Sequence, residues 1–229
     1  MSDERTAPAP AGTFETALRE VARARTQRRR WLAIIGLPVV AAAGLGAWVW
    51  KPWQSVNLPE SACWSVVTKA DLKPLAGDDG TATVDSSGDL SGRLPYPDCR
   101  IYWNGAKRKP LLSVTVLHPS DTVYNHVLGL GKPGTSLDPR PIELGAGVTG
   151  WITRDANVDL VYRCDAVAAA DSPFREILVS GSPVSGDSHS TSVREAHVGL
   201  AWRTAAAAIR AEGCRSAALV ASQPATPAQ

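Results

Sequence analysis

Few residues of this 229-residue chain combine the types and the spacing that carry chemistry. The segment Gly145–Gly150 matches the GxGxxG pattern of a dinucleotide-binding loop, which needs a strand before it and a helix after it. Here Trp151 begins a strand-like segment, so we interpret the glycines as a turn. A triad of Ser185, Asp187 and His197 cannot be recognised, because triad geometry is tertiary. The sequence predicts no catalytic, cofactor or metal site.

The four cysteines are the clearest reactive residues. Their even number in an exported segment predicts two disulfides, and the absence of a CxxC pair argues against zinc. Four cysteines allow three pairings. We favour Cys63 with Cys99 and Cys164 with Cys214, because each pair joins a predicted helix to a predicted strand nearby in the sequence.

A basic cluster, Lys107-Arg108-Lys109, is expected at the tip of a hairpin. Such a cluster either contacts anionic lipid headgroups or an anionic envelope polymer, or is simply solvated. The chain as a whole has 24 basic and 22 acidic residues, and this near balance argues against nucleic acid as a partner.

The segment Trp31–Trp50 contains no charged residue and is long enough to cross a hydrocarbon core of about 30 Å as a helix. Tryptophans mark both of its ends, as is typical of the membrane interface. Arg28-Arg29-Arg30 precedes the segment and only Lys51 follows it directly. The positive-inside rule therefore predicts a single-pass plasma-membrane protein with a cytoplasmic N-terminus and an extracytoplasmic body.

Two alternatives for this segment stay open. Ala41-Ala42-Ala43 matches the small residues of a signal-peptide cleavage site, and Arg28-Arg29 resembles a twin-arginine export signal. The apolar stretch continues as far as Trp50, which favours an uncleaved anchor.

Composition and periodicity divide the chain into five segments and predict an α+β fold. The segments are a largely disordered cytoplasmic basic tail (1–30), a transmembrane helix (31–50), a short linker (51–59), an extracytoplasmic α+β domain (60–216) and a disordered tail (217–229). We expect the domain to be an antiparallel β-sheet packed by a long C-terminal helix and preceded by one transmembrane helix.

Within the domain, local patterns predict the individual elements. Alternating apolar residues and turn signals predict two hairpins and one further strand, and a capping box predicts the long helix. The elements are a broken helix (63–77), a loop (78–92), a first hairpin (99–104 with 111–118), a second hairpin (151–153 with 158–164), a short strand (176–179) and a helix opened by Ser192 and Glu195 that ends at Gly213.

Three of these segments, Cys63–Gly77, Cys99–Trp103 and the helix that ends at Gly213-Cys214, resemble a family. They resemble uncharacterised actinobacterial single-pass membrane proteins with a four-cysteine extracytoplasmic domain. They are also distantly similar to actinobacterial secreted lipoprotein and kinase-sensor-type domains. The lipoprotein cysteine is missing, and Trp64–Val67 replaces the usual leucines. The resemblance implies an extracytoplasmic α+β domain of unknown ligand, without catalytic residues to transfer.

We therefore expect a membrane-anchored binding or scaffold module of the cell envelope, or a ligand-sensing one. Its expected partners are the plasma membrane and another envelope protein or an anionic polymer, without nucleic acid or a cofactor. The alternative is a small envelope hydrolase whose Ser/His site forms only in the folded domain.

The charge asymmetry around Trp31–Trp50 generates a test of orientation. Protease added to intact spheroplasts should remove the body and leave a small membrane-held fragment, detected with an N-terminal tag. Full protection of the body, in spheroplasts whose known external proteins are digested, would reverse the predicted orientation.

Overall fold

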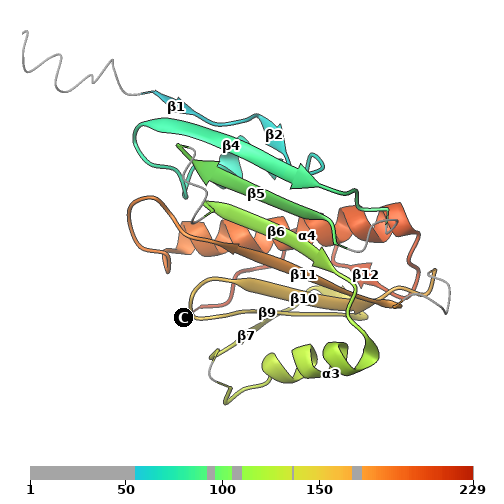
Figure 1. The fold of residues 1–229 in the computed structure, drawn as a ribbon. Coiled ribbons are helices and arrows are strands. Elements are labelled where there is room, and N and C mark those ends of the chain that lie inside the picture. The colour runs from blue at the N-terminus through green and yellow to red at the C-terminus, as the bar shows by residue number, and fades with distance from the viewer. Residues whose placement is uncertain (1–54, 92–95, 105–109, 136, 167–171, 229) are drawn as a thin grey trace, which may run out of the picture. The chain divides into compact units, whose positions relative to one another are not determined.

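An antiparallel-dominated sheet forms the frame of this α+β structure, a computed structural model that describes residues 55–91, 96–104, 110–135, 137–166 and 172–228 (Figure 1). The strands of the sheet are β1 (Val56–Asn57), β4 (Gly80–Ser87), β5 (Asp98–Trp103), β6 (Leu112–Leu117), β7 (Arg140–Ile142), β9 (Val148–Ile152), β10 (Val158–Arg163) and β11 (Phe174–Gly181). They lie in the order β1-β4-β5-β6-β11-β10-β9-β7. β1 pairs with β4 in parallel, and the other neighbours in the sheet pair antiparallel.

Smaller elements complete the described fold. Two short pairs lie outside the main sheet, β2 (Ser61–Ala62) with β3 (Val67–Thr68) and β8 (Gly145–Ala146) with β12 (Ala218–Leu219). The described helices are α2 (Lys69–Leu72), α3 (Asp121–Leu130) and α4 (Thr191–Glu212). The predicted sheet with a long C-terminal helix is confirmed, and so are both predicted hairpins, β5 with β6 and β9 with β10.

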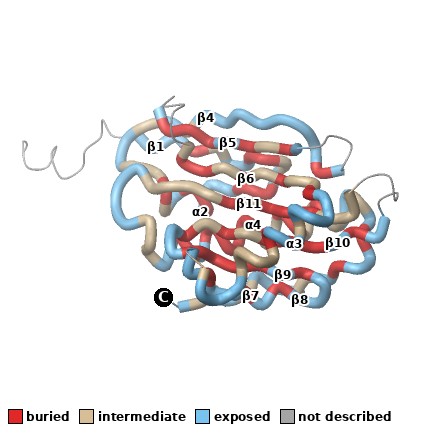
Figure 2. The backbone as a smooth tube through the Cα atoms, turned by 60° about the horizontal axis from the view of Figure 1, so that its bottom comes forward, coloured by how far each residue is buried: buried red, intermediate tan, exposed pale blue. Residues whose placement is uncertain are grey.

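Buried residues are concentrated in the central strands and in α4 (Figure 2), and their alternation along the strands separates two faces of the sheet. In β6, Leu112, Val114 and Val116 are buried, whereas Ser113 and Thr115 between them are only half-buried. The buried face packs against α4, which contributes small residues such as Ala201 and Ala205 to the same core (Figure 1). Small side chains let a helix approach a sheet closely, so this face forms the main core.

The opposite face is covered over β10 by α3, an element that the sequence analysis did not predict. Val127 of α3 packs with Trp151 and Val161, and these three residues form a second, smaller cluster. Tyr124 stacks on Phe174 with ring centroids 4.0 Å apart. The helix was not predicted because its apolar pattern is weak. Of its ten residues only Val127 is buried, so the sequence has no continuous apolar stripe to indicate a helix.

Two predicted elements are wrong. Residues 78–92 were expected to be a loop, yet Gly80–Ser87 forms β4, whose small polar side chains are mostly exposed and whose backbone pairs with β5. Residues 63–77 were expected to be a broken helix, yet only Lys69–Leu72 is helical. Cys63, Trp64 and Ser65 have positive φ angles, which are incompatible with a right-handed helix. Thr68 and Asp71 form a capping box at the start of α2, because Asp71 accepts hydrogen bonds from the Thr68 amide at 2.8 Å and from the Thr68 hydroxyl at 2.7 Å.

The C-terminal tail, expected to be disordered from residue 217, is instead held against α4. Beyond the β12 pairing, Trp202 Nε1 donates to the Val220 carbonyl at 3.2 Å. Gln223 Nε2 donates to the Glu195 carbonyl at 3.2 Å, in space left by Gly199, where a Cβ would lie 2.6 Å from Gln223 Oε1. Composition predicts disorder here because large apolar residues are few, only Leu219 and Val220, whereas hydrogen bonds with α4 hold the tail in place.

Several predictions concern residues outside the described ranges. The transmembrane segment 31–50, the basic tail 1–30 and the cluster Lys107-Arg108-Lys109 all lie there. Among the residues that the structure does describe, none belongs to a helix long and apolar enough to cross a membrane.

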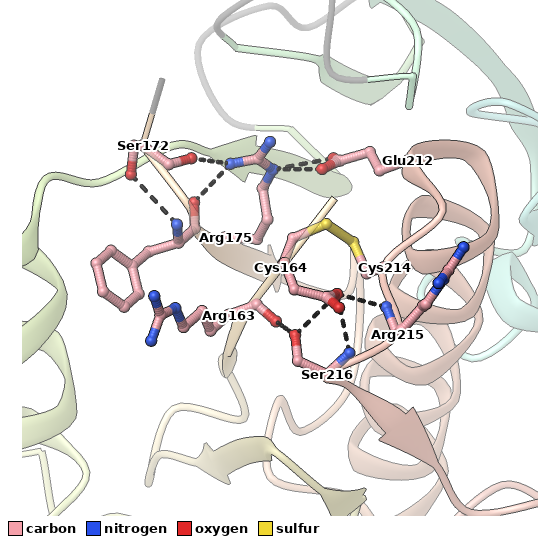
Figure 3. The surroundings of a disulfide bond; sticks show 10 residues. Arg163, Cys164, Ser172, Arg175, Glu212, Cys214, Arg215 and Ser216 are labelled. Carbon is pink, nitrogen blue, oxygen red and sulfur yellow. Dashed lines mark hydrogen bonds and ion pairs between the residues drawn. A yellow bond between two sulfur atoms is a disulfide. The ribbon is translucent and has the colours of Figure 1, made fainter. Parts of the chain in front are cut away.

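Two disulfides join the pairs favoured from the sequence, Cys63 with Cys99 and Cys164 with Cys214. The second connects the residue after β10 to a residue just beyond α4, and its Cα atoms lie 4.8 Å apart (Figure 3). Beside it, Arg175 and Glu212 form an ion pair at 2.7 Å, with side chains only 2% and 4% exposed. The C-terminal end of α4 is therefore fixed to the sheet by one covalent bond and one buried ion pair.

A buried carboxyl pair lies on the α3 face of the sheet. Asp159 is opposite Leu178, and Glu176 is opposite Val161, so the two acids are diagonal neighbours on adjacent strands. Their side chains are hydrogen bonded, and burial, followed by the neighbouring Glu176, raises the pKa of Asp159 to about 8. Burial also raises the pKa of Glu176. Two carboxyl groups so close in an apolar setting retain a proton that they would lose in water.

Removing the C-terminal disulfide should destabilise the domain. Its 50-residue separation corresponds to about 4 kcal/mol of unfolded-chain entropy. Urea unfolding of the unit Gln54–Gln229 should show a loss of that order in the Cys164→Ala/Cys214→Ala double variant. Wild-type stability in the double variant would mean that the cross-link does not constrain the unfolded chain.

The carboxyl pair predicts a pH dependence with a definite sign. Because the folded state holds a proton that the unfolded Asp159 releases near its ordinary value of 3.8, the free energy of unfolding should fall as pH rises from about 4 to 8. Asp159→Asn should lose this decline and become more stable than wild type near pH 8. The exposed Asp155→Asn variant is the control and should keep the wild-type profile. Parallel profiles of wild type and Asp159→Asn would contradict the assignment.

Candidate functional site

The candidate site is a polar cavity of about 370 Å³ beside the first turn of α4. Four chain segments meet there: the region around β7, the turn between β9 and β10, the loop before α4 and α4 itself. We call it the arginine pocket, and its lining residues are Asp138, Arg140, Thr153, Arg154, Asp187, His189 and Arg194.

Local pairing explains why these segments converge. Arg140 of β7 is opposite Ile152 of β9, so the β9–β10 turn begins beside it. That turn is closed by a bond of 2.8 Å from the Thr153 amide to the Asn157 carbonyl. The loop before α4 is tied to the turn, because His189 Nδ1 lies 2.7 Å from the Arg154 carbonyl oxygen. A carbonyl only accepts, so Nδ1 carries the proton of this bond.

Arg194 is the most unusual residue of the pocket. It is 4% exposed, and one terminal nitrogen of its guanidinium donates to the Pro227 carbonyl at 3.0 Å. Burial, and then the neighbouring charge of Arg140, lowers the pKa of Arg194. This direction agrees with a guanidinium that no carboxylate contacts, since a carboxylate beside it would raise the value.

The negative charges of the pocket are already engaged. Asp138 faces Arg154 at 3.4 Å, and Asp187 accepts a bond of 2.8 Å from the His189 backbone amide. Among the described residues, no carboxylate lies within ion-pair distance of Arg140 or Arg194. The pocket therefore has two guanidinium groups whose charges are not paired within the described protein.

The start of α4 adds to this positive potential. Ser190 caps the helix, and its hydroxyl oxygen accepts from the Val193 amide at 3.4 Å. The sequence analysis placed the start at Ser192, two residues later than this cap. The N-terminus of a 22-residue helix carries a partial positive charge that favours anions. Chemically, the arrangement can hold a small anion.

Ser185 and His197, two of the residues considered for a triad, differ in their exposure and have no hydrogen bond to each other among the described contacts. His197 is fully buried, with Nδ1 2.7 Å from the Ala156 carbonyl, whereas Ser185 is exposed. In the arginine pocket, Asp187 accepts a hydrogen bond from the His189 backbone amide, and the Nδ1 of His189 lies 2.7 Å from the Arg154 carbonyl oxygen. The segment Gly145–Gly150 is not a dinucleotide-binding loop, because no helix follows it: Gly145 and Ala146 form β8, and Val148–Gly150 already belong to β9. The predicted turn is confined to Gly147, whose φ is 72°.

A second cavity, of about 820 Å³, lies beside β1 and α2 and has a less specific lining. Its wall includes Val56 and Leu58, together with Lys69, whose amine pairs with Glu60 at 2.8 Å. Its lining has two lysines and two acidic residues. All of these charged residues are exposed, so none needs a ligand as a counter-charge. We therefore take the arginine pocket as the candidate site.

Sequence reasoning missed the arginine pocket because its two key residues are 54 positions apart and meet only in the fold. One signal was available. Arg194 lies in the first turn of a capped helix, where acidic residues are preferred and a cation opposes the helix dipole. The two predicted disulfides lie away from the lining of the pocket.

Comparison of the chain with protein-family models, with curated proteins and with solved structures returned no match, so the arginine pocket rests on the geometry and charges above.

Proposed function

We propose that this protein is a single-pass plasma-membrane protein whose extracytoplasmic domain binds and senses a small ligand in the arginine pocket. The observation that carries the proposal is the buried, uncompensated Arg194 in a cavity formed by four chain segments. Binding sites are typically concave, with a few convergent polar groups and ionisable residues of perturbed pKa.

Two further features support the location. The uncharged segment Trp31–Trp50 follows Arg28-Arg29-Arg30, which favours a cytoplasmic N-terminus. The two disulfides suit an oxidising compartment, because cytoplasmic thiols are kept reduced.

The dimensions and connections of the pocket favour sensing of a small molecule. At about 370 Å³ it lies near the lower end of the range for small-molecule sites. One of its lining residues, Arg194, belongs to α4, which packs along the sheet and holds the C-terminal tail through the bond from Arg194 to Pro227. A ligand that contacts Arg194 is thereby connected to the position of this tail, which gives binding a route to a conformational signal.

Native mass spectrometry of the full chain, released from detergent after isolation from membranes, tests the proposal. The wild-type protein should retain a non-covalent ligand of small-molecule mass. Arg154→Trp should lose it, because the Arg154 side chain is 75% exposed and a bulky ring there fills the pocket without disturbing the core.

The matched control places the same ring outside the pocket. Val84→Trp, on the exposed surface of β4, should retain the ligand. Identical spectra for wild type and Arg154→Trp, with both variants folded by circular dichroism, would contradict a ligand site in the arginine pocket.

A further inference from the structure

The charges of the arginine pocket define the chemical class of its ligand. We propose that the pocket binds a small oxyanion, a carboxylate or a phosphate, between the guanidinium groups of Arg140 and Arg194. This inference rests on the proposed function, because it takes the arginine pocket as the ligand site.

The first argument is the repulsion between like charges. Arg140 and Arg194 are close enough for the charge of one to lower the pKa of the other, and Arg194 is almost fully removed from water. A buried charge is costly unless a counter-charge accompanies it. Among the described residues neither arginine has a carboxylate within ion-pair distance, and Asp138 already pairs with Arg154, so a bound anion would supply a direct counter-charge.

The second argument is the number of hydrogen-bond donors that remain. A guanidinium has five N–H groups in a planar fork, and a single bond, from one terminal nitrogen to Pro227, accounts for one of them in Arg194. The fork matches the paired oxygens of a carboxylate or a phosphate, which a neutral or cationic ligand lacks. Bonding to Pro227 also orients the group before the ligand arrives.

The third argument concerns size and selectivity. A cavity of about 370 Å³ holds a small metabolite rather than an extended polymer. Asp138 and Asp187 also line it, so additional negative groups on a larger polyanion would meet like charges. The N-terminus of α4 lies on the same side as Arg194 and adds its partial positive charge.

Calorimetric titration of the full chain in nanodiscs of neutral lipid tests the inference. The probes are inorganic phosphate and succinate, with glucose and ethanolamine as neutral and cationic controls. At least one of the two anions should bind with a Kd of about 1 mM or tighter, and glucose and ethanolamine should not. Which anion binds more tightly distinguishes a phosphorylated ligand from a carboxylic acid.

Matched arginine variants locate the binding. Arg140→Gln, at an exposed position, should weaken anion binding about tenfold or more, because a charged hydrogen-bond donor is lost. Arg100→Gln is the matched control and should change it less than about threefold, because Arg100 pairs with Asp98 on β5 and does not line the pocket. Arg194→Gln should abolish anion binding. Because Arg194 is buried, thermal unfolding will show whether this variant is folded. If it is not folded, the comparison of wild type with Arg140→Gln tests the oxyanion site alone.

The outcomes separate this inference from the proposed function. Binding of neither anion, or equal anion binding by wild type and Arg140→Gln, would overturn the oxyanion assignment. If mass spectrometry nevertheless finds a ligand that Arg154→Trp loses, the sensing function stands and the ligand is of another class. If wild type retains no ligand and binds none of the four probes, both proposals fail.

Discussion

The packing of α4 against the central strands is the interaction on which the rest of this structure depends. The helix buries residues such as Leu200, Ala201 and Ala205 against the apolar face of the sheet, and small side chains permit the close approach. Each end is then fixed independently. The C-terminal end is held by the Cys164–Cys214 disulfide and the Arg175–Glu212 ion pair, and the N-terminal end by the Ser190 cap. Arg203 adds a bond of 2.5 Å to Asp71, which joins α4 to α2.

The fixed position of α4 explains why Arg194 is buried in the first turn of the helix, beside residues of the core. Once Val193 and Ala196 are buried against the sheet, the neighbouring Arg194 is only 4% exposed and donates a hydrogen bond to the Pro227 carbonyl of the C-terminal tail. Keeping an arginine there costs stability, because its charge is desolvated and faces Arg140. Costs of this kind recur at functional sites, where the structure is arranged for a ligand rather than for maximum stability. The same reasoning separates the arginine pocket from the Asp159–Glu176 pair, where the proton retained on Asp159 relieves the repulsion between the two carboxyl groups.

Local sequence patterns predicted the elements that bury a regular apolar face. The alternation in residues 111–118 and 158–164 identified the central hairpins, and Gly213 marked the end of α4 through its left-handed conformation, φ 72°. The failures share one physical cause. β4, α3 and the tail are stabilised by backbone pairing, by a few contacts and by hydrogen bonds from distant residues, none of which leaves a periodic pattern. The arginine pocket could not be predicted from the sequence for the same reason, because Arg140 and Arg194 come together only when the sheet is assembled.

The central claim is that this assembly brings to one pocket two guanidinium groups that no described carboxylate pairs with, and that both bind the same oxyanion. Anomalous diffraction from crystals grown with selenate, a heavy oxyanion, tests it most directly. The account predicts an anomalous peak within hydrogen-bond distance of both Arg140 and Arg194 in wild type, and its absence in Arg140→Gln crystals. A carboxylate of the chain paired with Arg194 in a well-ordered pocket, or selenate bound only elsewhere, would contradict the account.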